Sequence, residues 1–148
     1  GELFNLAWHD VDLRGCLLTV AGAGAKSGRT RHIPLNEEAF AVLTAWRNQS
    51  DADAVRVFPS PVTGERLDNV NTAWREIMKK AQVTGFRFHD LRHTFASNLV
   101  MLGADLTTVR ELLGHADIET TLRYAHLAPE HKAATVALLS KAKSIEAG

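Results

Sequence analysis

The chain has 148 residues, of which 17 are Lys or Arg, 17 are Asp or Glu and 45 % are apolar, so its formal net charge is zero. This length suits one compact domain, and the apolar fraction with balanced charge excludes a disordered chain or a polyelectrolyte tail. A membrane protein and a secreted disulfide scaffold are also excluded, because no apolar run approaches ~20 residues, the N-terminus has no signal-peptide pattern and Cys16 is the single cysteine.

The first quarter of the chain predicts a short β-hairpin. Residues 2–7 have the pattern of the end of a helix, and residues 8–12 have that of a turn. Apolar and β-branched side chains predict strands at residues 16–21 and 30–35. The connection between these strands is rich in glycine, which is typical of a hairpin tip, and three cations lie on it or directly after it: Lys26, Arg29 and Arg31.

Helices are predicted over most of the remaining chain. Asn36 and Asp68 are suitable N-caps, and Gly103 and Gly114 are suitable helix stops. The apolar spacing predicts helices from Asn36 through Trp46, from Asp68 to Ala81, from Phe88 or His89 to Leu102, over 106–113, over 117–124, and from Pro129 onward. In the third of these helices, the side chains expected to face the core are Leu91, Phe95, Leu99 and Leu102. The sequence therefore predicts a mainly α domain with one small β-hairpin.

Charge is unevenly distributed along this neutral chain. Residues 34–72 carry six acidic side chains against three arginines. Residues 73–93 carry two acidic side chains against five bases, which are Arg75, Lys79, Lys80, Arg87 and Arg92. A local basic face can hold phosphates, although a solvated helix face has the same composition.

The most specific cluster of polar residues runs from His89 to His93. His89 and Arg92 are three residues apart on a predicted helix, so both side chains can point the same way. A guanidinium can direct two hydrogen bonds at a phosphate, and an imidazole can donate a hydrogen bond or move a proton near neutral pH. The alternative is structural: His89 caps the helix, and Arg92 pairs with Asp90 or another acid.

A metal site is a second interpretation of the same cluster. His89 and His93 are four residues apart, a spacing that can bind zinc on one helical face, and His115 follows later. However, no carboxylate stands between the two histidines in the usual zinc-protease pattern, and Arg92 would place a cation beside the metal. The spacing agrees better with a phosphate site than with a metal site.

Two further candidates follow the helix stop at Gly114. His115 comes directly after it, where a side chain can face a cleft or satisfy the last carbonyls of the helix. Tyr124 is nine residues further on and is the only tyrosine in the chain. A phenol is almost fully protonated at neutral pH, so it acts as a nucleophile only with a base or with neighbouring cations; otherwise it is a core aromatic. The residues available to assist it are His89, Arg92 and His115.

Five segments of the chain, taken together, are similar to the catalytic domain of the tyrosine recombinases, the phage-type integrases. They are residues 2–12, 26–35, 86–96, 111–115 and 120–126. The joint order of His-x-x-Arg, Leu-Gly-His and a tyrosine nine residues later is more specific than any one piece. The resemblance implies the catalytic-domain fold of the DNA breaking-rejoining enzymes, mainly α with a small β-sheet.

The resemblance also implies a reaction and a role for each site residue. Tyr124 would attack a DNA phosphodiester and leave a 3′-phosphotyrosyl link and a free 5′-hydroxyl. Arg92 would be the second of two arginines on the non-bridging oxygens, and Lys26 would protonate the departing 5′-oxygen. His89 would assist proton transfer at the tyrosine, and His115 would hydrogen-bond the phosphate. Cations placed in this way stabilise the negative charge of the transition state, and no metal, nucleotide or other cofactor is expected.

The partners that the resemblance implies are double-stranded DNA and further copies of the protein, arranged as a tetramer on DNA, in the cytoplasm of a bacterial or phage-infected cell. In relatives, a segment after the tyrosine often docks on a neighbouring subunit, and Val136, Leu138 and Leu139 are expected to form such a patch. The residues expected to contact DNA are Lys26, Arg29, Arg31, Arg75, Lys79, Arg87 and His93.

Part of the family pattern is expected to lie before this chain. The first catalytic arginine of the family stands a few residues before the pair found here as Glu2-Leu3, and a DNA-gripping domain precedes it. Residues 1–148 are therefore expected to be an N-terminally truncated catalytic domain that cleaves DNA very weakly alone, because a lost cation costs ~10²–10³-fold in rate. A catalytically silent DNA-binding relative, a related topoisomerase and a histidine–metal phosphoesterase stay open as alternatives.

Overall fold

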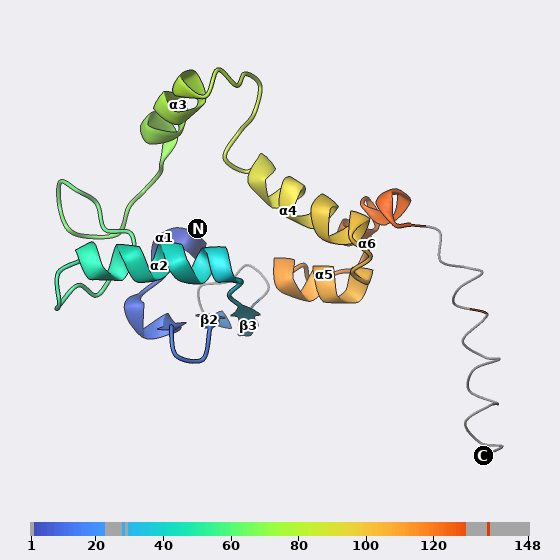
Figure 1. Ribbon diagram of the computed structural model, residues 1–148, viewed down its shortest axis with the longest axis horizontal. Coiled ribbons are helices and arrows are strands. Elements are labelled where there is room, and N and C mark those ends of the chain that lie inside the picture. Colours follow the sequence, from blue (N-terminus) through green and yellow to red (C-terminus); the bar gives the residue numbers. More distant parts are fainter. Residues whose placement is uncertain (1, 23–27, 29, 130–135, 137–148) are drawn as a thin grey trace, which may run out of the picture.

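The computed structural model describes residues 2–22, 28, 30–129 and 136 (Figure 1). The predicted mainly helical chain with one small sheet is confirmed, and none of the described helices is long and apolar enough to cross a membrane. In chain order the elements are α1 (Glu2–Asn5), η1 (Trp8–Asp10), β1 (Val11–Asp12), β2 (Leu17–Val20), β3 (Arg31–Pro34), α2 (Glu37–Gln49), α3 (Asn71–Lys80), α4 (Asp90–Met101), α5 (Leu106–Leu113), α6 (Glu119–Leu122) and η3 (Ala125–Leu127).

The sheet is antiparallel, with the strand order β1-β2-β3. Leu18 of β2 lies opposite Ile33 of β3, so the predicted hairpin is confirmed. Leu18 also lies opposite Val11, because residues 11–12 form the short edge strand β1 where the sequence predicted only a turn. A strand of two residues is too short to show an alternating pattern, so nothing local indicates it. The hairpin-tip residues Lys26 and Arg29 lie outside the described part of the chain.

Local capping residues set the beginning of α2 and both ends of α5. The Asn36 side chain accepts a hydrogen bond from the Ala39 backbone N–H at 2.9 Å, as predicted for an N-cap. Gly114 ends α5 with a φ of 67°, in the left-handed region that favours glycine. The predicted cap at Asp68 is wrong: α3 begins at Asn71 without a side-chain cap, because the Asn69 side chain accepts from the Asn71 N–H at 3.0 Å and forms a turn before the helix.

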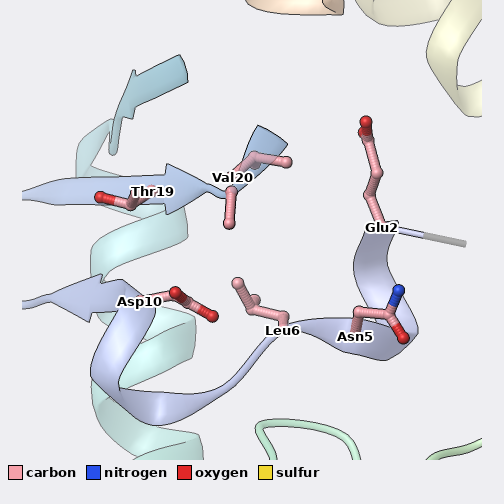
Figure 2. A pocket seen from close by; sticks show the side chains of 7 residues that line it. Glu2, Asn5, Leu6, Asp10, Thr19 and Val20 are labelled. Atoms are coloured by element: carbon pink, nitrogen blue, oxygen red, sulfur yellow. The ribbon is translucent and has the colours of Figure 1, made fainter. Parts of the chain in front are cut away.

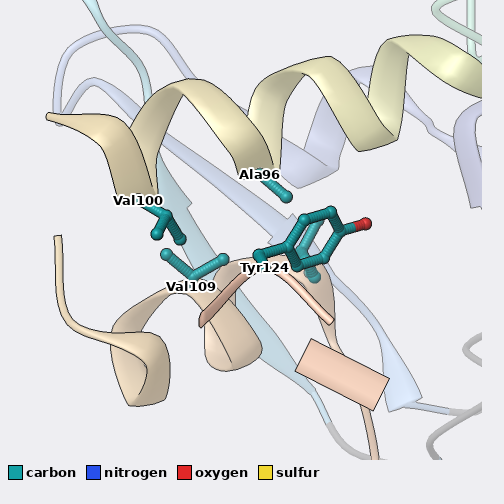
Figure 3. Packing of buried hydrophobic residues seen from close by; sticks show 5 residues of the cluster. Ala96, Val100, Val109 and Tyr124 are labelled. Carbon is teal, nitrogen blue, oxygen red and sulfur yellow. The ribbon is translucent and has the colours of Figure 1, made fainter. Parts of the chain in front are cut away.

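The core beside the candidate site lies between α4 and α5 (Figure 3). Its buried side chains come from α4, α5 and the segment after α6: Ala96, Val100, Val109, Leu113 and Tyr124. The predicted inward stripe of α4 is wrong, because Leu91, Phe95 and Leu102 are 43 %, 46 % and 84 % exposed. Only its Leu99 packs partly against the core. Ala96 and Val100 follow the same four-residue spacing one position later, and their short side chains leave room for α5 close to α4.

A second buried cluster joins the start of the chain to the loop after α2. Leu6 and Val57 are buried, and the Val57 N–H donates to the Leu6 carbonyl at 3.1 Å. The Trp46 indole N–H of α2 donates to the Val57 carbonyl at 2.6 Å. Between α1 and β2 a cavity of ≈60 Å³ separates Leu6 from Val20, and it has room for no more than a few water molecules (Figure 2). These hydrogen bonds hold the segment after α1 against α2 and the loop that follows it.

Candidate active site

Tyr124 combines a buried ring with a hydroxyl at the edge of the core. The residue is 5 % exposed, and its ring packs among Ala96, Val100 and Val109 (Figure 3). Its hydroxyl points out of this apolar cluster and lies 2.6 Å from Nδ1 of His93. A buried phenol is stable only when its O–H has a partner, which explains the orientation of the ring.

The histidine in contact with the phenol is His93, which the sequence predicted as a DNA contact. His89, which was expected to assist proton transfer at Tyr124, occupies the N-cap position of α4. The His89 ring lies edge-on to the His93 ring, with centroids 5.4 Å apart and an interplanar angle of 82°. The four-residue spacing indicated that these rings share a helix face, but it could not indicate which of them contacts a residue 31 positions away.

Arg92 links α4 to the end of α5. Its guanidinium is half-buried and donates from Nη2 to the Leu113 carbonyl, one of the last carbonyls of α5. Burial lowers the pKa of Arg92, while the Glu2 carboxylate opposes this shift; a guanidinium remains protonated in either case. Arg92 does not pair with Asp90, because that carboxylate accepts hydrogen bonds from Arg87 at 2.8–3.3 Å.

His115 follows the left-handed turn at Gly114, and Thr121 orients its ring. Nδ1 lies 2.8 Å from the Thr121 hydroxyl, which is fully buried. Burial lowers the pKa of the His115 imidazole, and the positive charges of Arg92 and Arg123 lower it further. His115 is therefore neutral at pH 7, and a Thr121 hydroxyl that donates to Nδ1 leaves the ring proton on Nε2, where it can donate to a ligand.

The lowered pKa of His115 predicts a loss of stability in mild acid. The unfolded chain takes up a proton at the ordinary imidazole pKa, before folded His115 does, so falling pH favours unfolding. We expect the Tm, followed by circular dichroism from about pH 7.5 to about pH 5.5, to fall less steeply in His115→Asn than in the unchanged chain. Equal slopes in the two proteins would show that His115 contributes nothing to this dependence.

Arg31, another predicted DNA contact, is paired inside the structure. Its Nη1 and Nη2 donate to the two carboxylate oxygens of Glu2 at 3.1 Å and 2.6 Å, and its side chain is 14 % exposed. These hydrogen bonds hold the pKa of Glu2 below its usual range. A Cβ placed on Gly114 would lie 2.7 Å from Arg31 Nη1, so the guanidinium also covers the end of α5. Arg31 thus joins α1, β3 and α5.

Gly114→Ala is expected to destabilise the fold by more than its backbone conformation alone requires. The left-handed φ disfavours alanine by about 1–2 kcal/mol, and the added methyl group would also push Arg31 away from Glu2. Gly64→Ala is the matched control, because Gly64 has a φ of 71° and a methyl group added there would have nothing within 4 Å. Urea unfolding of both variants should show the larger loss for Gly114→Ala, whereas equal losses would contradict a contact with Arg31.

A groove of about 700 Å³ opens between β3 and the C-terminal half of α5, beside Arg31, Gly114 and His115. Arg31 and His32 line it from β3, Arg110 lines it from α5, and His115 and Asp117 lie at its end. The groove therefore joins one strand of the hairpin to the histidine that follows Gly114.

Three further predicted DNA contacts do not line this groove: Arg75, Lys79 and Arg87. Arg75 and Lys79 are on the exposed face of α3, which is held by Trp74: its indole N–H donates to the Phe86 carbonyl at 3.1 Å. Arg87 is exposed and forms an ion pair with Asp90 at 2.9 Å. Lys26 and Arg29 lie outside the described residues, as do Leu138 and Leu139 of the expected docking patch; Val136 is exposed.

The metal interpretation of the histidine pair has no support in the described geometry. Among residues 2–22, 28, 30–129 and 136, no three His, Cys, Asp or Glu side chains are gathered as metal ligands would be. His93 Nδ1 contacts Tyr124 instead.

Known sequences similar to this chain are integrases and recombinases. The chain is 35 % identical over 142 residues to the integrase of Salmonella phage P22, covering 88 % of this chain and 36 % of that protein. It is 38 % identical over 136 residues to the tyrosine recombinase XerD of Pseudomonas aeruginosa, covering 86 % of this chain and 44 % of that protein. The chain thus spans about two fifths of the length of these relatives.

Solved structures agree with the sequence relatives. XerA recombinase has a TM-score of 0.71 at 30 % identity, with 95 % of this chain and 52 % of that chain covered. The catalytic domain of bacteriophage HP1 integrase has a TM-score of 0.67 at 27 % identity, with 92 % and 71 % covered. The phage integrase family matches residues 1–131 of the sequence. By sequence and by fold, the chain belongs to the phage integrase family, the tyrosine recombinases.

Proposed function

We propose that the chain is the catalytic domain of a site-specific DNA recombinase and that Tyr124 is its nucleophile. The observation that carries this proposal is the position of the only tyrosine: its ring is fixed in the core, while its hydroxyl leaves the core at His93. Arg92 stands one residue before His93, the histidine that contacts Tyr124, and the positive charge of Arg92 lowers the pKa of His115. Family membership adds support, because the curated relatives are named integrases and tyrosine recombinases.

The proposed reaction exchanges one phosphodiester for another. Tyr124 Oη attacks the phosphorus, the bond from phosphorus to the 5′-oxygen breaks, and the strand is left as a 3′-phosphotyrosyl ester. Lys26 gives a proton to the departing 5′-oxygen, and a histidine takes the proton of the phenol. Arg92 and His115 donate hydrogen bonds to the non-bridging oxygens, whose negative charge increases in the transition state. Rejoining reverses these steps with another 5′-hydroxyl, so the bond energy is conserved without nucleotide or metal.

Double-stranded DNA is the proposed partner. A relative that is 25 % identical, XerH site-specific recombinase, was solved bound to a palindromic difH substrate, with a TM-score of 0.67. The groove lined by Arg31 and His115 is proposed to hold a DNA strand, because it ends at His115, a residue of the proposed site. Exchange between two duplexes breaks four strands and needs four tyrosines, so we propose a tetramer on DNA. Arg75 and Lys79 on α3 are proposed as further phosphate contacts.

A covalent adduct is the direct test of this function. The chain is incubated with duplexes that are randomised in sequence and carry a nick, so that the short 5′-hydroxyl fragment diffuses away and cleavage cannot reverse. We expect a protein–DNA band on a denaturing gel, insensitive to chelators, and mass spectrometry should find the nucleotide on the peptide that contains Tyr124. Because the adduct accumulates irreversibly, slow cleavage is sufficient.

The same assay separates the alternative functions. DNA binding without an adduct would indicate a catalytically silent relative. Chelator-sensitive cleavage without a phosphotyrosyl link would indicate a metal phosphoesterase. An adduct that relaxes supercoiled DNA without joining different duplexes would indicate a topoisomerase.

A further inference from the structure

The contact between His93 and Tyr124 has the geometry of a proton transfer. Nδ1 and the phenol oxygen are 2.6 Å apart, and the ring centroids are 6.1 Å apart with an interplanar angle of 49°. The phenol cannot easily turn away, because its ring is buried among Val100, Val109 and Leu113. A general base must lie within about 2.6–3.2 Å of the atom whose proton it removes, and His93 satisfies this condition before any substrate is bound.

The neighbours of His93 keep its ring in this position. His93 is half-buried on α4, and the His89 ring lies against it edge-on. His89 itself stands one helical turn away, at the N-cap position, so it reaches Tyr124 only through the His93 ring. The two histidines therefore differ in what they touch, although they lie on the same face.

We propose, on the basis of the function proposed above, that His93 rather than His89 is the proton acceptor of Tyr124, and that His89 is a positioning residue for the His93 ring. As Oη bonds to phosphorus, its O–H bond breaks and the proton passes to Nδ1, which makes His93 an imidazolium. The bond from phosphorus to the 5′-oxygen breaks at the same time. On rejoining, the imidazolium returns this proton to Oη as the tyrosine leaves.

A purely structural role for His93 makes different predictions. In that role the imidazole only satisfies a buried hydroxyl, and any hydrogen-bonding side chain at the same place would serve. His93→Asn places an amide where Nδ1 stands, so it keeps a hydrogen-bond partner for the phenol but cannot accept a proton near neutral pH. His89→Asn makes the same change one turn earlier, and His9→Asn makes it at an exposed histidine of η1 whose neighbour is Asp10.

The decisive measurement is the rate of adduct formation on two substrates: the nicked duplex recovered in the test above, and the same duplex with sulfur in place of the bridging 5′-oxygen. A thiolate leaves without needing a proton. The sulfur substrate therefore restores the rate of a variant that lacks the general acid, but not the rate of a variant that lacks the general base. We expect His93→Asn to lose about 10²–10⁴-fold on both substrates. The rate of His89→Asn should fall by less than tenfold, and the rate of His9→Asn should equal that of the unchanged chain. Lys26→Ala should form the adduct slowly on the oxygen substrate and at a restored rate on the sulfur substrate.

Three outcomes would overturn the assignment of His93. They are an unchanged rate in His93→Asn, restoration of this variant by the sulfur substrate, and a loss in His89→Asn as large as that in His93→Asn. If the unchanged chain forms no adduct, the proposed function fails instead, so the two failures are distinguishable.

A second measurement needs no DNA. The ¹⁵N shifts of the histidine rings show which nitrogen carries a proton, and the single tyrosine makes Tyr124→Phe a clean reference. At neutral pH we expect His93 Nδ1 to be unprotonated and its shift to move in Tyr124→Phe. A proton on Nδ1, with the phenol oxygen as acceptor, would overturn the assignment whatever the activity.

Discussion

Tyr124→Phe is expected to abolish the covalent adduct. The substitution removes only the phenol oxygen, so no atom is left to attack phosphorus, and the rate should fall by at least ~10⁴-fold, as in enzymes that lose their nucleophile. The ring remains in the cluster with Ala96 and Leu113, so the fold is retained at a loss of about 1 kcal/mol for the hydrogen bond to His93. Denaturing gels measure the adduct, and urea unfolding measures the stability.

DNA affinity is the control for this variant. Fluorescence anisotropy with a labelled duplex should give the same Kd for Tyr124→Phe and for the unchanged chain, because the phenol carries no charge to the phosphates. An adduct formed by the variant at the original rate would mean that another side chain is the nucleophile. If Tyr124→Phe loses DNA binding as well as adduct formation, Tyr124 acts in DNA recognition instead.

Arg92→Ala is expected to have the next largest effect, a loss of about 10²–10³-fold in adduct formation. The half-buried guanidinium stands one residue before His93, and its charge acts on His115, so its loss removes positive charge from the place where the phosphorane would form. Arg92→Lys keeps the positive charge but lacks the two forked donors of the guanidinium. Its rate is therefore expected to lie between that of Arg92→Ala and that of the unchanged chain. Single-turnover rates on the nicked duplex measure this series.

Stability has to be followed in the same variants, because Arg92 also donates to the Leu113 carbonyl at the end of α5. Urea unfolding separates this structural contribution from the catalytic one. Arg66→Ala is the matched control: Arg66 is exposed in the loop before α3, and its nearest acid, Asp68, is 4.0 Å away. A rate for Arg92→Ala equal to that of Arg66→Ala would remove Arg92 from the proposed site.

Features that depend on neighbouring residues could be predicted without the structure. The hairpin follows from two β-branched runs separated by glycines, and the N-cap at Asn36 follows from a side chain that reaches the first turn of its own helix. Gly114 ends α5 because the left-handed turn suits glycine. The order of His89, Arg92, His115 and Tyr124 along the chain was also sufficient to indicate the family, which the comparisons confirm.

Features that depend on distant residues could not be predicted in this way. Arg31 binds Glu2 across 29 positions, and His93 rather than His89 contacts Tyr124 across 31 positions. The buried side chains of α4, Ala96 and Val100, stand one position after the apolar positions expected to be buried, such as Phe95. Because both sets have the same spacing, periodicity alone did not show which set is buried. The choice follows from how closely α5 and the segment after α6 approach α4, since this packing buries one face of the helix and turns the Tyr124 hydroxyl toward one particular histidine.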